Sequence, residues 1–320
     1  MLAAYVEKAN PSDPLAALVV GDRPGPELPD GWVRVRVRAA ALNHHDVWSL
    51  RGVGLPPERM PMILGTDAAG TTDDGRDVIV HAVIASAGWS GDETLDPRRT
   101  LLSEMHQGTL AEYVAVPEEN LVAKPSGLSW EDAACLPTAY LTAWRMLHRA
   151  DLDRGDTVLV QGASGGVASA AIQLAQLLGL RVWATARTED KRRFARELGA
   201  DAVFEPGSRL PERVDAVIET VGEATWSHSL RALRPGGTVV VCGATSGANP
   251  PADLNRVFFL QLRVQGSTMG TRAELEDLVA AMLDAGVRPR IDRVLTLDAV
   301  GEGLGALASG AVLGKIVATP

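Results

Sequence analysis

Cysteine is nearly absent: the sequence of 320 residues contains only Cys135 and Cys242, each among apolar residues. Two thiols cannot form a four-thiolate zinc site, and a disulfide framework would need more of them. We therefore expect both cysteines to be reduced and buried in the core of a cytoplasmic protein. The first residues also lack the basic start and the apolar centre of a secretory signal.

An excess of positive charge is also lacking, since 31 Lys and Arg stand against 40 Asp and Glu, a formal net charge of −9. Nucleic-acid binding relies on a surplus of Lys and Arg, so this balance excludes a nucleic-acid partner. No run reaches the roughly 18 apolar residues of a membrane-spanning helix, so we expect no membrane association. With 46% hydrophobic and 22% charged residues the composition is typical of a globular protein, and the length fits two domains.

The first 125 residues show no long helical periodicity and contain short Val-rich runs separated by Gly, Pro and Asp. Residues 32–42, 77–85 and 112–117 have the alternating or continuous apolar patterns of strands. In the run VRVRVR the strict alternation predicts a half-buried strand with its arginines facing solvent. The polar, irregular stretch 86–109 predicts a surface lobe on a mainly β domain.

From residue 126 the pattern changes to strands that alternate with helices. Ser129 is a plausible N-cap, and the apolar run 158–160 fits a strand buried on both faces of a parallel sheet. Gly179 directly follows the next predicted helix, at a position where the backbone commonly adopts the left-handed conformation that glycine favours. The alternation predicts a doubly wound α/β domain over 126–262, inserted between the segments that form the other domain, which are 1–125 and 263–320.

The stretch QGASGGVA (161–168) follows a predicted strand and opens a predicted helix. Gly165 and Gly166 let a phosphate approach backbone N–H groups, and the start of the helix favours negative charge. Ala163 and Ala168 stand where the first and third glycines of G-x-G-x-x-G would fall; the first is a real departure from the pattern. The strand–turn–helix context predicts dinucleotide binding, and the alternative is an ordinary glycine-rich turn.

The second strand of this unit ends in WATARTEDKRR, which places Ala186 where NAD-dependent enzymes carry an acid. Arg187 follows at once, and Lys191 comes one helical turn later. A small residue followed by cations suits the 2′-phosphate of NADPH, because a guanidinium can bind a phosphate with two hydrogen bonds. The sequence therefore favours NADPH, with solvated helix charges as the alternative interpretation of both residues.

Motifs spread over nearly the whole chain resemble the medium-chain dehydrogenase/reductase superfamily, especially its zinc-free quinone oxidoreductase branch. They are ALNHHDVW, MILGTDAAG, GTLAEYVAVP, CLPTAYLTAW, VLVQGASGGVASAAIQLA, LRPGGTVVVCG, QGSTMGTRAELEDL and GKIV. The resemblance implies a GroES-like, mainly β catalytic domain beside a Rossmann cofactor domain. It also implies a homodimer that pairs through an edge strand within 258–270.

Two adjacent histidines beside a carboxylate in ALNHHDVW raise the question of a metal site. The resemblance places the ligands of zinc-dependent members at Asn43, Thr66 and near Ala134, and none of these is a thiolate or an imidazole here. The lobe also lacks the four cysteines of the family's structural zinc. We interpreted His44 and His45 as neighbours in an extended segment, whose side chains point to opposite faces and cannot share one ion. His81 and His106 have no ligand spacing to support a site, so the sequence predicts no metal.

The resemblance places Asn43 near the nicotinamide ribose, His44 near the pyrophosphate and His45 at the proton-relay position of alcohol dehydrogenases. Asp46 would support this loop. Asn43, His45 and Tyr140 are thus the candidate catalytic residues, although His45 could equally be a hydrogen-bonded core histidine, and Trp48 and Tyr140 could be core. The candidate cofactor-binding residues are Asn43, His44, Thr138, Ser164, Gly165, Gly166, Val167, Arg187, Lys191, Val221, Gly243, Ala244, Ser267, Met269 and Lys315.

These residues and the resemblance predict an NADPH-dependent oxidoreductase that reduces quinones or α,β-unsaturated carbonyl compounds by hydride transfer without zinc. Lacking a Lewis acid, such an enzyme needs small-molecule acceptors whose conjugation already spreads the incoming charge. Two alternatives stay open: a zinc-type alcohol dehydrogenase with atypical ligands, and an NADPH-binding protein without turnover.

Overall fold

The computed structural model describes all residues, 1–320, and divides the chain into two compact units. Unit 1 contains Met1–Thr138 and Gly270–Pro320, and unit 2 contains Ala139–Met269. The insertion of one unit between two segments of the other agrees with the predicted order. No helix combines the length and apolar character that are needed to span a lipid bilayer.

Both boundaries fall somewhat later than the predicted ones, because short elements join the unit that precedes them. Helix α2 (Trp130–Ala134) contacts β3 (Trp32–Ala41) and β5 (Asp67–Thr72) of unit 1. Strand β16 (Arg263–Gly266) pairs with β15 (Leu233–Val241) in unit 2. The residues at each junction therefore follow their hydrogen-bond and packing partners.

Unit 1 is mainly β, as predicted, and its largest sheet has the order β10-β6-β5-β3-β18-β17, with β9 also pairing with β3. Smaller sheets have the orders β2-β1-β4 and β7-β8. Its remaining strands are β1 (Leu2–Val6), β2 (Leu18–Asp22), β4 (Met62–Ile63), β6 (Asp77–Val80), β7 (Val83–Ile84), β8 (Thr100–Leu101), β9 (Tyr113–Pro117), β10 (Leu121–Ala123), β17 (Ile291–Thr296) and β18 (Lys315–Thr319).

The alternation predicted for β3 is confirmed, since Val35 and Val37 are buried while the arginines between them face solvent. The same strand pairs with β18, opposite Ala40 and Ala41, which brings Lys315 close to the end of β3. The helices of unit 1 are α1 (His44–Leu50), α2, α8 (Arg272–Asp284) and α9 (Val300–Ser309). Its single-turn helices are Pro14–Ala17, Pro57–Arg59, Glu93–Leu95, Glu118–Asn120 and Leu297–Ala299, and a π-helical turn, Leu136–Tyr140, spans the junction.

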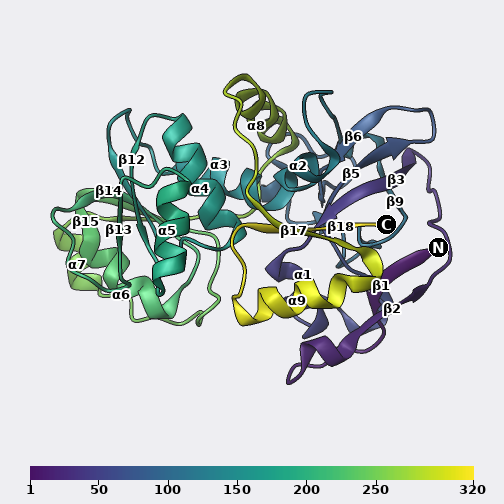
Figure 1. Ribbon diagram of the computed structural model, residues 1–320, viewed down its shortest axis with the longest axis horizontal. Helices are drawn as coiled ribbons and strands as arrows, with labels where there is room; N and C mark the ends of the chain where they lie inside the picture. Colours follow the sequence, from purple (N-terminus) through teal and green to yellow (C-terminus); the bar gives the residue numbers. More distant parts are fainter. The chain divides into compact units, whose positions relative to one another are not determined.

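Unit 2 is the predicted doubly wound domain, with helices packed around a central sheet (Figure 1). The sheet is six-stranded and wholly parallel, with the order β13-β12-β11-β14-β15-β16. The order reverses between β11 and β14, so their carboxyl ends flank the place where such sheets bind ligands. Its other strands are β11 (Thr157–Val160), β12 (Arg181–Thr185), β13 (Ala202–Phe204) and β14 (Val214–Glu219). Its helices are α3 (Leu141–Arg149), α4 (Gly166–Leu177), α5 (Glu189–Glu197), α6 (Glu223–Ala232) and α7 (Leu254–Phe259).

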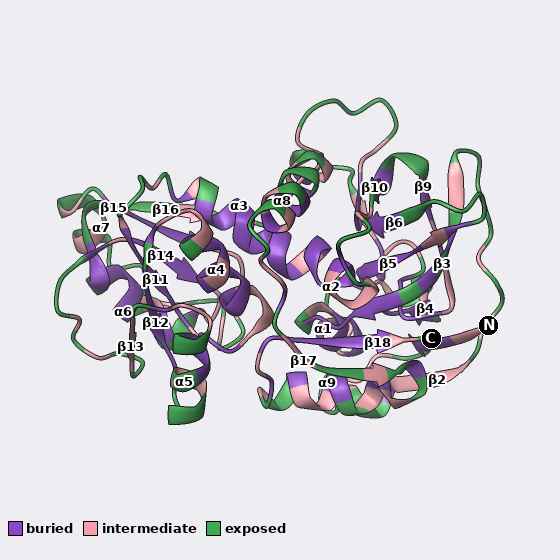
Figure 2. Cartoon of the chain, turned by 45° about the horizontal axis from the view of Figure 1, so that its top comes forward, coloured by how far each residue is buried: buried purple, intermediate pink, exposed green.

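Local signals in unit 2 act as expected. The whole of β11 is buried, as a central strand covered on both faces must be (Figure 2). Gly179 has φ +74° just after α4, the left-handed conformation predicted there. The predicted edge strand within 258–270 is a strand only over β16, because Asp253 caps α7 and places Phe258 and Phe259 in that helix.

Candidate functional site

Helix α1 begins immediately after Asn43, so His44 and His45 lie in the first turn of a helix. Our interpretation of an extended segment was therefore wrong. The reason is Asp46, whose Oδ2 accepts from the backbone N–H of Asn43 (2.8 Å) while its Oδ1 accepts from the N–H of Gly65 (3.0 Å). Asn43 followed three residues later by Asp46 is the pattern of a capping box, which signals the start of a helix.

Asp46 is fully buried, and burial raises the pKa of its carboxyl to about 6, against the opposing effects of His45 and the Asn43 N–H. Its two hydrogen bonds join the start of α1 to the segment before β5. Asp46 thus supports this loop, which is the role that the resemblance implied.

A buried ion pair lies beneath the start of α1. The ammonium of Lys315 donates to Leu42 O (2.8 Å), to Asn43 Oδ1 (2.6 Å) and to Asp67 Oδ2 (3.4 Å). Asn43 Nδ2 donates to Asp67 Oδ2 (2.9 Å) and to Thr66 Oγ1 (3.2 Å). Burial raises the pKa of Asp67, although Lys315 and Asn43 act to lower it.

Two of the predicted site residues take part in this buried cluster. Asn43 and Lys315 are 8% and 2% exposed. Their polar atoms bond inside unit 1, where the amide bridges the lysine and the aspartate, and so help to fix where α1 starts. Their contact with the cofactor and the catalytic role of Asn43 stay predictions.

The groups at the zinc-ligand positions do not fit a catalytic zinc. Thr66 bonds to Asn43 and to Thr138 Oγ1 (3.0 Å), and no three His, Cys, Asp or Glu residues are grouped to hold an ion. Cys135 is buried as expected, and burial raises the pKa of its thiol. Cys242 is only half-buried, contrary to expectation.

The remaining histidines are also occupied elsewhere. His81 is buried, and its Nε2 donates to Gly270 O (2.9 Å). His106 bonds to Thr100 Oγ1 (2.9 Å) and packs against the ring of Trp32. Neither histidine reaches the start of α1.

His45 has a partner that sequence analysis missed, Glu104 of the lobe, at 2.9 Å from Nε2. Burial alone would lower the pKa of His45, but the hydrogen bond to Glu104 and the charges of Asp46, Glu104 and Asp67 together raise it. The other ring nitrogen, Nδ1, is buried and has no hydrogen-bond partner. The protonated form of this imidazole is therefore favoured relative to a solvated histidine, and one of its nitrogens has no partner in the protein.

A glycine makes room for this pair. Gly54 has φ +76°, and a Cβ there would lie 2.9 Å from Glu104 Oε1. Close by on α1, Trp48 is half-buried and lies under the guanidinium of Arg51 (4.9 Å). His44 is exposed at the surface, but the protein around it removes part of the water from its ring, and this desolvation and the charges of Lys315 and Arg51 lower its pKa. Its contact with the cofactor stays a prediction.

The hydroxyl of Tyr140 is bonded within unit 2. The residue is fully buried, and its hydroxyl donates to Gln173 Oε1 of α4 (2.6 Å). The bond joins the start of α3 to α4, and a catalytic role of Tyr140 stays a prediction.

At the carboxyl edge of the unit 2 sheet, the glycine turn has the expected form. Gly162 has φ +74°, and a Cβ there would lie 2.9 Å from the side chain of Val221. Gly165 is the N-cap of α4, with φ −75°, and a Cβ there would meet nothing within 4 Å. Neither the backbone conformation nor the packing requires glycine at this position. Because glycine has no side chain, however, a ligand can approach the N-terminus of α4 closely.

The basic residues after β12 also fit a phosphate. Ala186 is buried at the strand end, Arg187 is exposed, and Lys191 is half-buried. The pKa of Lys191 is lowered by burial and then by the positive charge of Arg187. Two cations held near each other suit a ligand with two negative charges. By contrast, Arg192 is committed to Glu189 (2.9 Å) and to carbonyl oxygens.

The other candidates lie after strand ends or near the glycine turn, and their roles stay predictions. Gly243 and Ala244 follow β15, and Val221 follows β14. Ser267 Oγ is buried without a partner, and the next residue but one, Met269, has φ +44°. The remaining candidates at this edge are Ser164, Gly166 and Val167, which belong to the turn or to the first residues of α4.

Comparisons with known proteins agree with this architecture. The family model Alcohol dehydrogenase GroES-like domain matches residues 29–126, and the model Zinc-binding dehydrogenase matches residues 166–284. The chain is 33% identical over 251 residues to the probable acrylyl-CoA reductase AcuI of Escherichia coli strain K12, covering 75% of this chain and 74% of AcuI.

Two solved structures are similar over the whole chain. One is described as an NAD-dependent alcohol dehydrogenase, with 35% identity, a TM-score of 0.92 and full coverage of both chains. The other is the 2-octenoyl-CoA carboxylase reductase CinF in complex with NADP and 2-octenoyl-CoA. It has 26% identity and a TM-score of 0.92, and the match covers 99% of this chain and 87% of CinF.

Proposed function

Because the chain belongs to the medium-chain dehydrogenase/reductase superfamily, we propose that it is an NADPH-dependent reductase of conjugated carbonyl compounds that works without a metal ion. The acceptors are α,β-unsaturated carbonyl compounds, with α,β-unsaturated thioesters first and quinones next. The thioesters come first because AcuI and CinF are named as reductases of acrylyl-CoA and 2-octenoyl-CoA. The observation that carries the proposal is the pair of His45 Nε2 and Glu104 Oε1, 2.9 Å apart, in a unit without a metal-ligand set.

The carboxyl edge of unit 2 is where NADPH binds, and when bound it supplies the hydride. The N-terminus of α4 and the open face of Gly165 receive the pyrophosphate. Arg187 and Lys191 bind the 2′-phosphate, which also offsets the repulsion between them. CinF, which carries NADP, supports this choice of cofactor.

His45 supplies the proton. The Glu104 carboxylate favours the imidazolium form, so the ring is protonated at a higher pH than a solvated histidine would be. Nε2 stays on Glu104, and the protonated ring of His45 is the proton source for the enolate that an α,β-unsaturated acceptor becomes on reduction. Solvent then returns the proton to the half-exposed ring.

Conjugation takes the place of a Lewis acid in this scheme. A simple ketone needs its oxygen polarised before it accepts hydride, and Thr66 and Asn43 provide no ligand set for an ion that could do so. An enone or enoyl thioester spreads the incoming charge over its own carbonyl. The imidazolium of His45 then needs only to protonate the product.

The experiment is a screen of purified, untagged protein for oxidation of NADPH at 340 nm with crotonyl-CoA, acrylyl-CoA, a simple enone and a quinone. We expect turnover with at least one conjugated acceptor, no loss of activity with chelator, and less than stoichiometric zinc by elemental analysis. Activity with alcohols or ketones that needs stoichiometric zinc would instead favour a zinc-type alcohol dehydrogenase. The similarity to an alcohol dehydrogenase keeps that as the second candidate. Tight NADPH binding without turnover would favour a non-catalytic protein.

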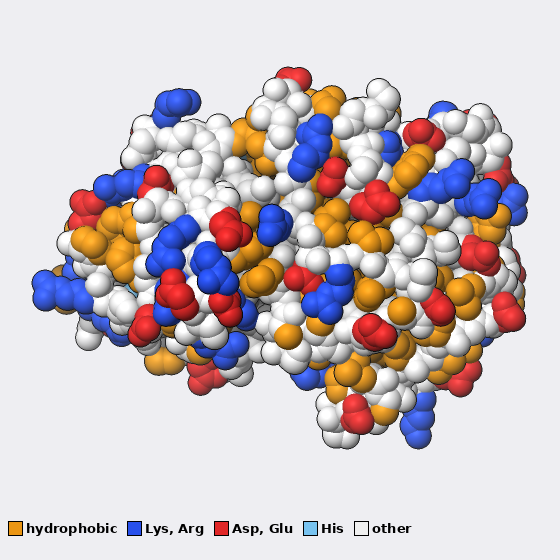
Figure 3. All heavy atoms as spheres, viewed as in Figure 1, with side chains coloured by type: hydrophobic (Ala, Val, Ile, Leu, Met, Phe, Trp, Pro, Cys, Tyr) orange, Lys and Arg blue, Asp and Glu red, His pale blue; other side chains and the backbone are white.

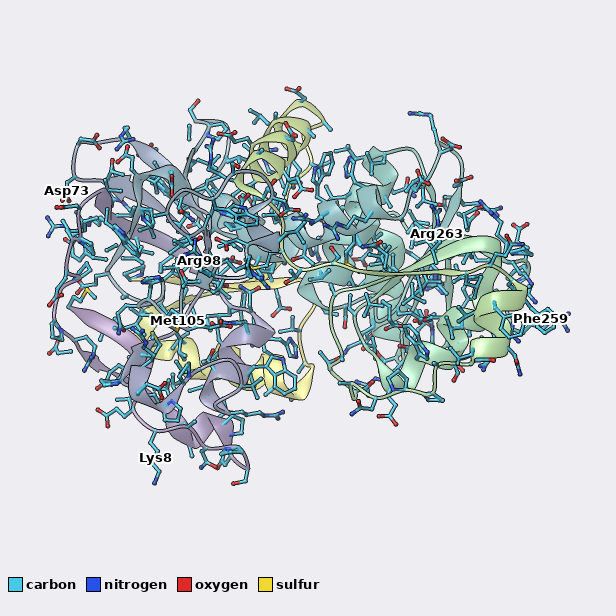
Figure 4. All side chains as sticks on the ribbon, turned by 180° about the vertical axis from the view of Figure 1, so that it is seen from behind. Lys8, Asp73, Arg98, Met105, Phe259 and Arg263 are labelled. Atoms are coloured by element: carbon cyan, nitrogen blue, oxygen red, sulfur yellow. The ribbon has the colours of Figure 1, made fainter.

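A homodimer through the edge of unit 2 accompanies this proposal. Phe258, Phe259 and Val264 are 58%, 75% and 52% exposed on α7 and the edge strand β16. Phe259 lies at the outer end of unit 2 (Figure 4). A second copy of the chain would cover these apolar side chains and pair the free strand edge. Light scattering should give a dimer, and Val264→Lys should give a monomer.

A further inference from the structure

A buried carboxylate lies at the end of β14, next to the reversal point of the unit 2 sheet. Oε1 of Glu219 accepts from the backbone N–H groups of Val221 (2.8 Å) and Gly222 (3.0 Å). Thr225 Oγ1 lies 2.8 and 2.9 Å from the two oxygens, and Ser229 Oγ donates to Oε2 (2.6 Å). Glu219 is fully buried, and this carboxylate holds the turn that follows its own strand.

Ser229 links that carboxylate to the end of β11. Gln161 Nε2 donates to Ser229 Oγ (3.0 Å) and to His228 Nδ1 (3.0 Å). Gln161 Oε1 accepts from Thr185 Oγ1 (2.6 Å), and Thr185 Oγ1 in turn accepts from the backbone N–H of Gly162 (3.3 Å). Buried hydrogen bonds therefore run from the glycine turn to Glu219.

The charge of Glu219 sets the direction of every bond in this chain. A carboxylate can only accept, so the Ser229 hydroxyl must donate to it and accept from the Gln161 amide. The amide oxygen must then face Thr185. His228 agrees with this direction, because its Nε2 bonds to Ser208 O (2.9 Å), which leaves Nδ1 to accept from Gln161.

We propose that Glu219 is a positioning residue for the dinucleotide, because it fixes both turns between which the nucleotide lies. It holds the 220–222 turn directly and the glycine turn through Ser229, Gln161 and Thr185. The two turns follow β14 and β11, the strands that flank the reversal point. The inference rests on the proposed binding of NADPH, and it assigns a role to residues that do not touch the cofactor.

The chain offers a matched control on the same strand. Asp215, near the amino end of β14, accepts from the backbone N–H of Thr157 (2.8 Å) and from Arg234 Nε. Asp215 therefore links β11, β14 and β15 at the amino edge of the sheet, whereas Glu219 acts at the carboxyl edge. Asp215→Asn and Glu219→Gln make the same chemical change at the two ends of one strand.

The experiment measures the Kd of NADPH by fluorescence titration, the melting temperature, and kcat for wild type and variants of the full chain. In Glu219→Gln one of the two carboxylate oxygens becomes an NH2 group, which donates; with the remaining oxygen on Val221 and Gly222, this group faces Ser229, so the chain of bonds reverses or breaks. We expect the Kd to rise roughly tenfold, the loss typical of one hydrogen bond to a charged group. Ser229→Ala should raise it at least threefold, with Ser229→Thr restoring binding, and the change should appear in Kd more than in kcat.

Asp215→Asn should lower the melting temperature and leave the Kd within twofold of wild type. An equal rise in Kd for Asp215→Asn and Glu219→Gln would overturn the inference, since general loss of stability would then explain both. An unchanged Kd in Ser229→Ala would overturn it as well, even if Glu219→Gln does not fold. If wild type itself fails to bind NADPH, the proposed function is refuted, whereas equal Kd values in wild type and Glu219→Gln would refute only the positioning role.

Discussion

Replacing Lys315 with Met keeps most of the volume of the side chain and removes the ammonium that neutralises Asp67. In the variant, the buried carboxylate of Asp67 keeps the Asn43 amide and the Thr138 hydroxyl as hydrogen-bond donors but no positive charge, and Leu42 O loses its partner. Removing one member of a buried ion pair costs about 3–5 kcal/mol, because the other charge stays buried and uncompensated. At about 2–4 °C per kcal/mol for a unit of this size, the melting temperature of unit 1 should fall by about 6–20 °C.

The deficit should depend on pH with a defined sign. Burial already raises the pKa of Asp67, and loss of Lys315 raises it further because a positive charge is removed. A carboxyl whose pKa is raised by folding is tolerated while protonated, and it destabilises the fold as pH rises above the pKa of the unfolded chain. The Lys315→Met variant should therefore lie closer to wild type in acid and further below it at neutral pH.

Thermal melts followed by circular dichroism at pH 5 and pH 8 test this reasoning. The double variant Asp67→Asn/Lys315→Met removes both charges and should recover at least half of the loss at pH 8. A loss of less than about 1 kcal/mol in Lys315→Met would refute the argument, since it would match a solvent-exposed pair. A loss that is the same at both pH values, or a double variant no better than the single one, would also refute it.

Four further variants have defined outcomes. Burial raises the pKa of Asp46 to about 6, so the free energy of unfolding of wild type should fall by about 3 kcal/mol as the pH rises from about 4 to 6. Urea melts of Asp46→Asn should lack this fall. Glu104→Gln should lower the pKa of His45 and move the alkaline fall in kcat to lower pH; an unmoved profile would separate the pair from catalysis. Arg187→Glu should weaken NADPH binding at least tenfold and NADH binding much less, as measured by fluorescence titration, whereas equal effects would remove it from the site. Gly165→Ala should leave the melting temperature unchanged, since its Cβ meets nothing, yet raise the Kd of NADPH.

Local patterns predicted the parts of the fold that depend on near neighbours in sequence. The alternation in β3 follows from a strand with one face in the core, and Val35 and Val37 are buried for that reason. Ser129 accepts from the N–H of Asp132 as predicted, because a helix start requires such an acceptor. The parallel sheet of unit 2 followed from the regular alternation of strands and helices.

The site was predicted less completely because its decisive contacts join distant residues. Lys315 lies 248 residues from Asp67 in sequence, and Glu104 lies 59 residues from His45. No periodicity encodes such pairs. Family position alone placed Asn43 and Lys315 near the cofactor, and no local pattern indicated the buried hydrogen bond that joins their side chains. The same limit hid Glu219, whose only local signal is a polar residue at the end of an apolar strand.

The interleaving of the two units has a consequence for how the chain is made. During synthesis Met1–Thr138 leaves the ribosome first, but β18, which lies between β3 and β17, follows all of unit 2. Unit 2 is continuous and can fold as a unit while β3 still presents an unpaired edge. Until Lys315 has been synthesised, Asp67 has no positive partner. A pause or truncation before Lys315 should therefore leave an aggregation-prone intermediate in which unit 2 is folded and the sheet of unit 1 is incomplete.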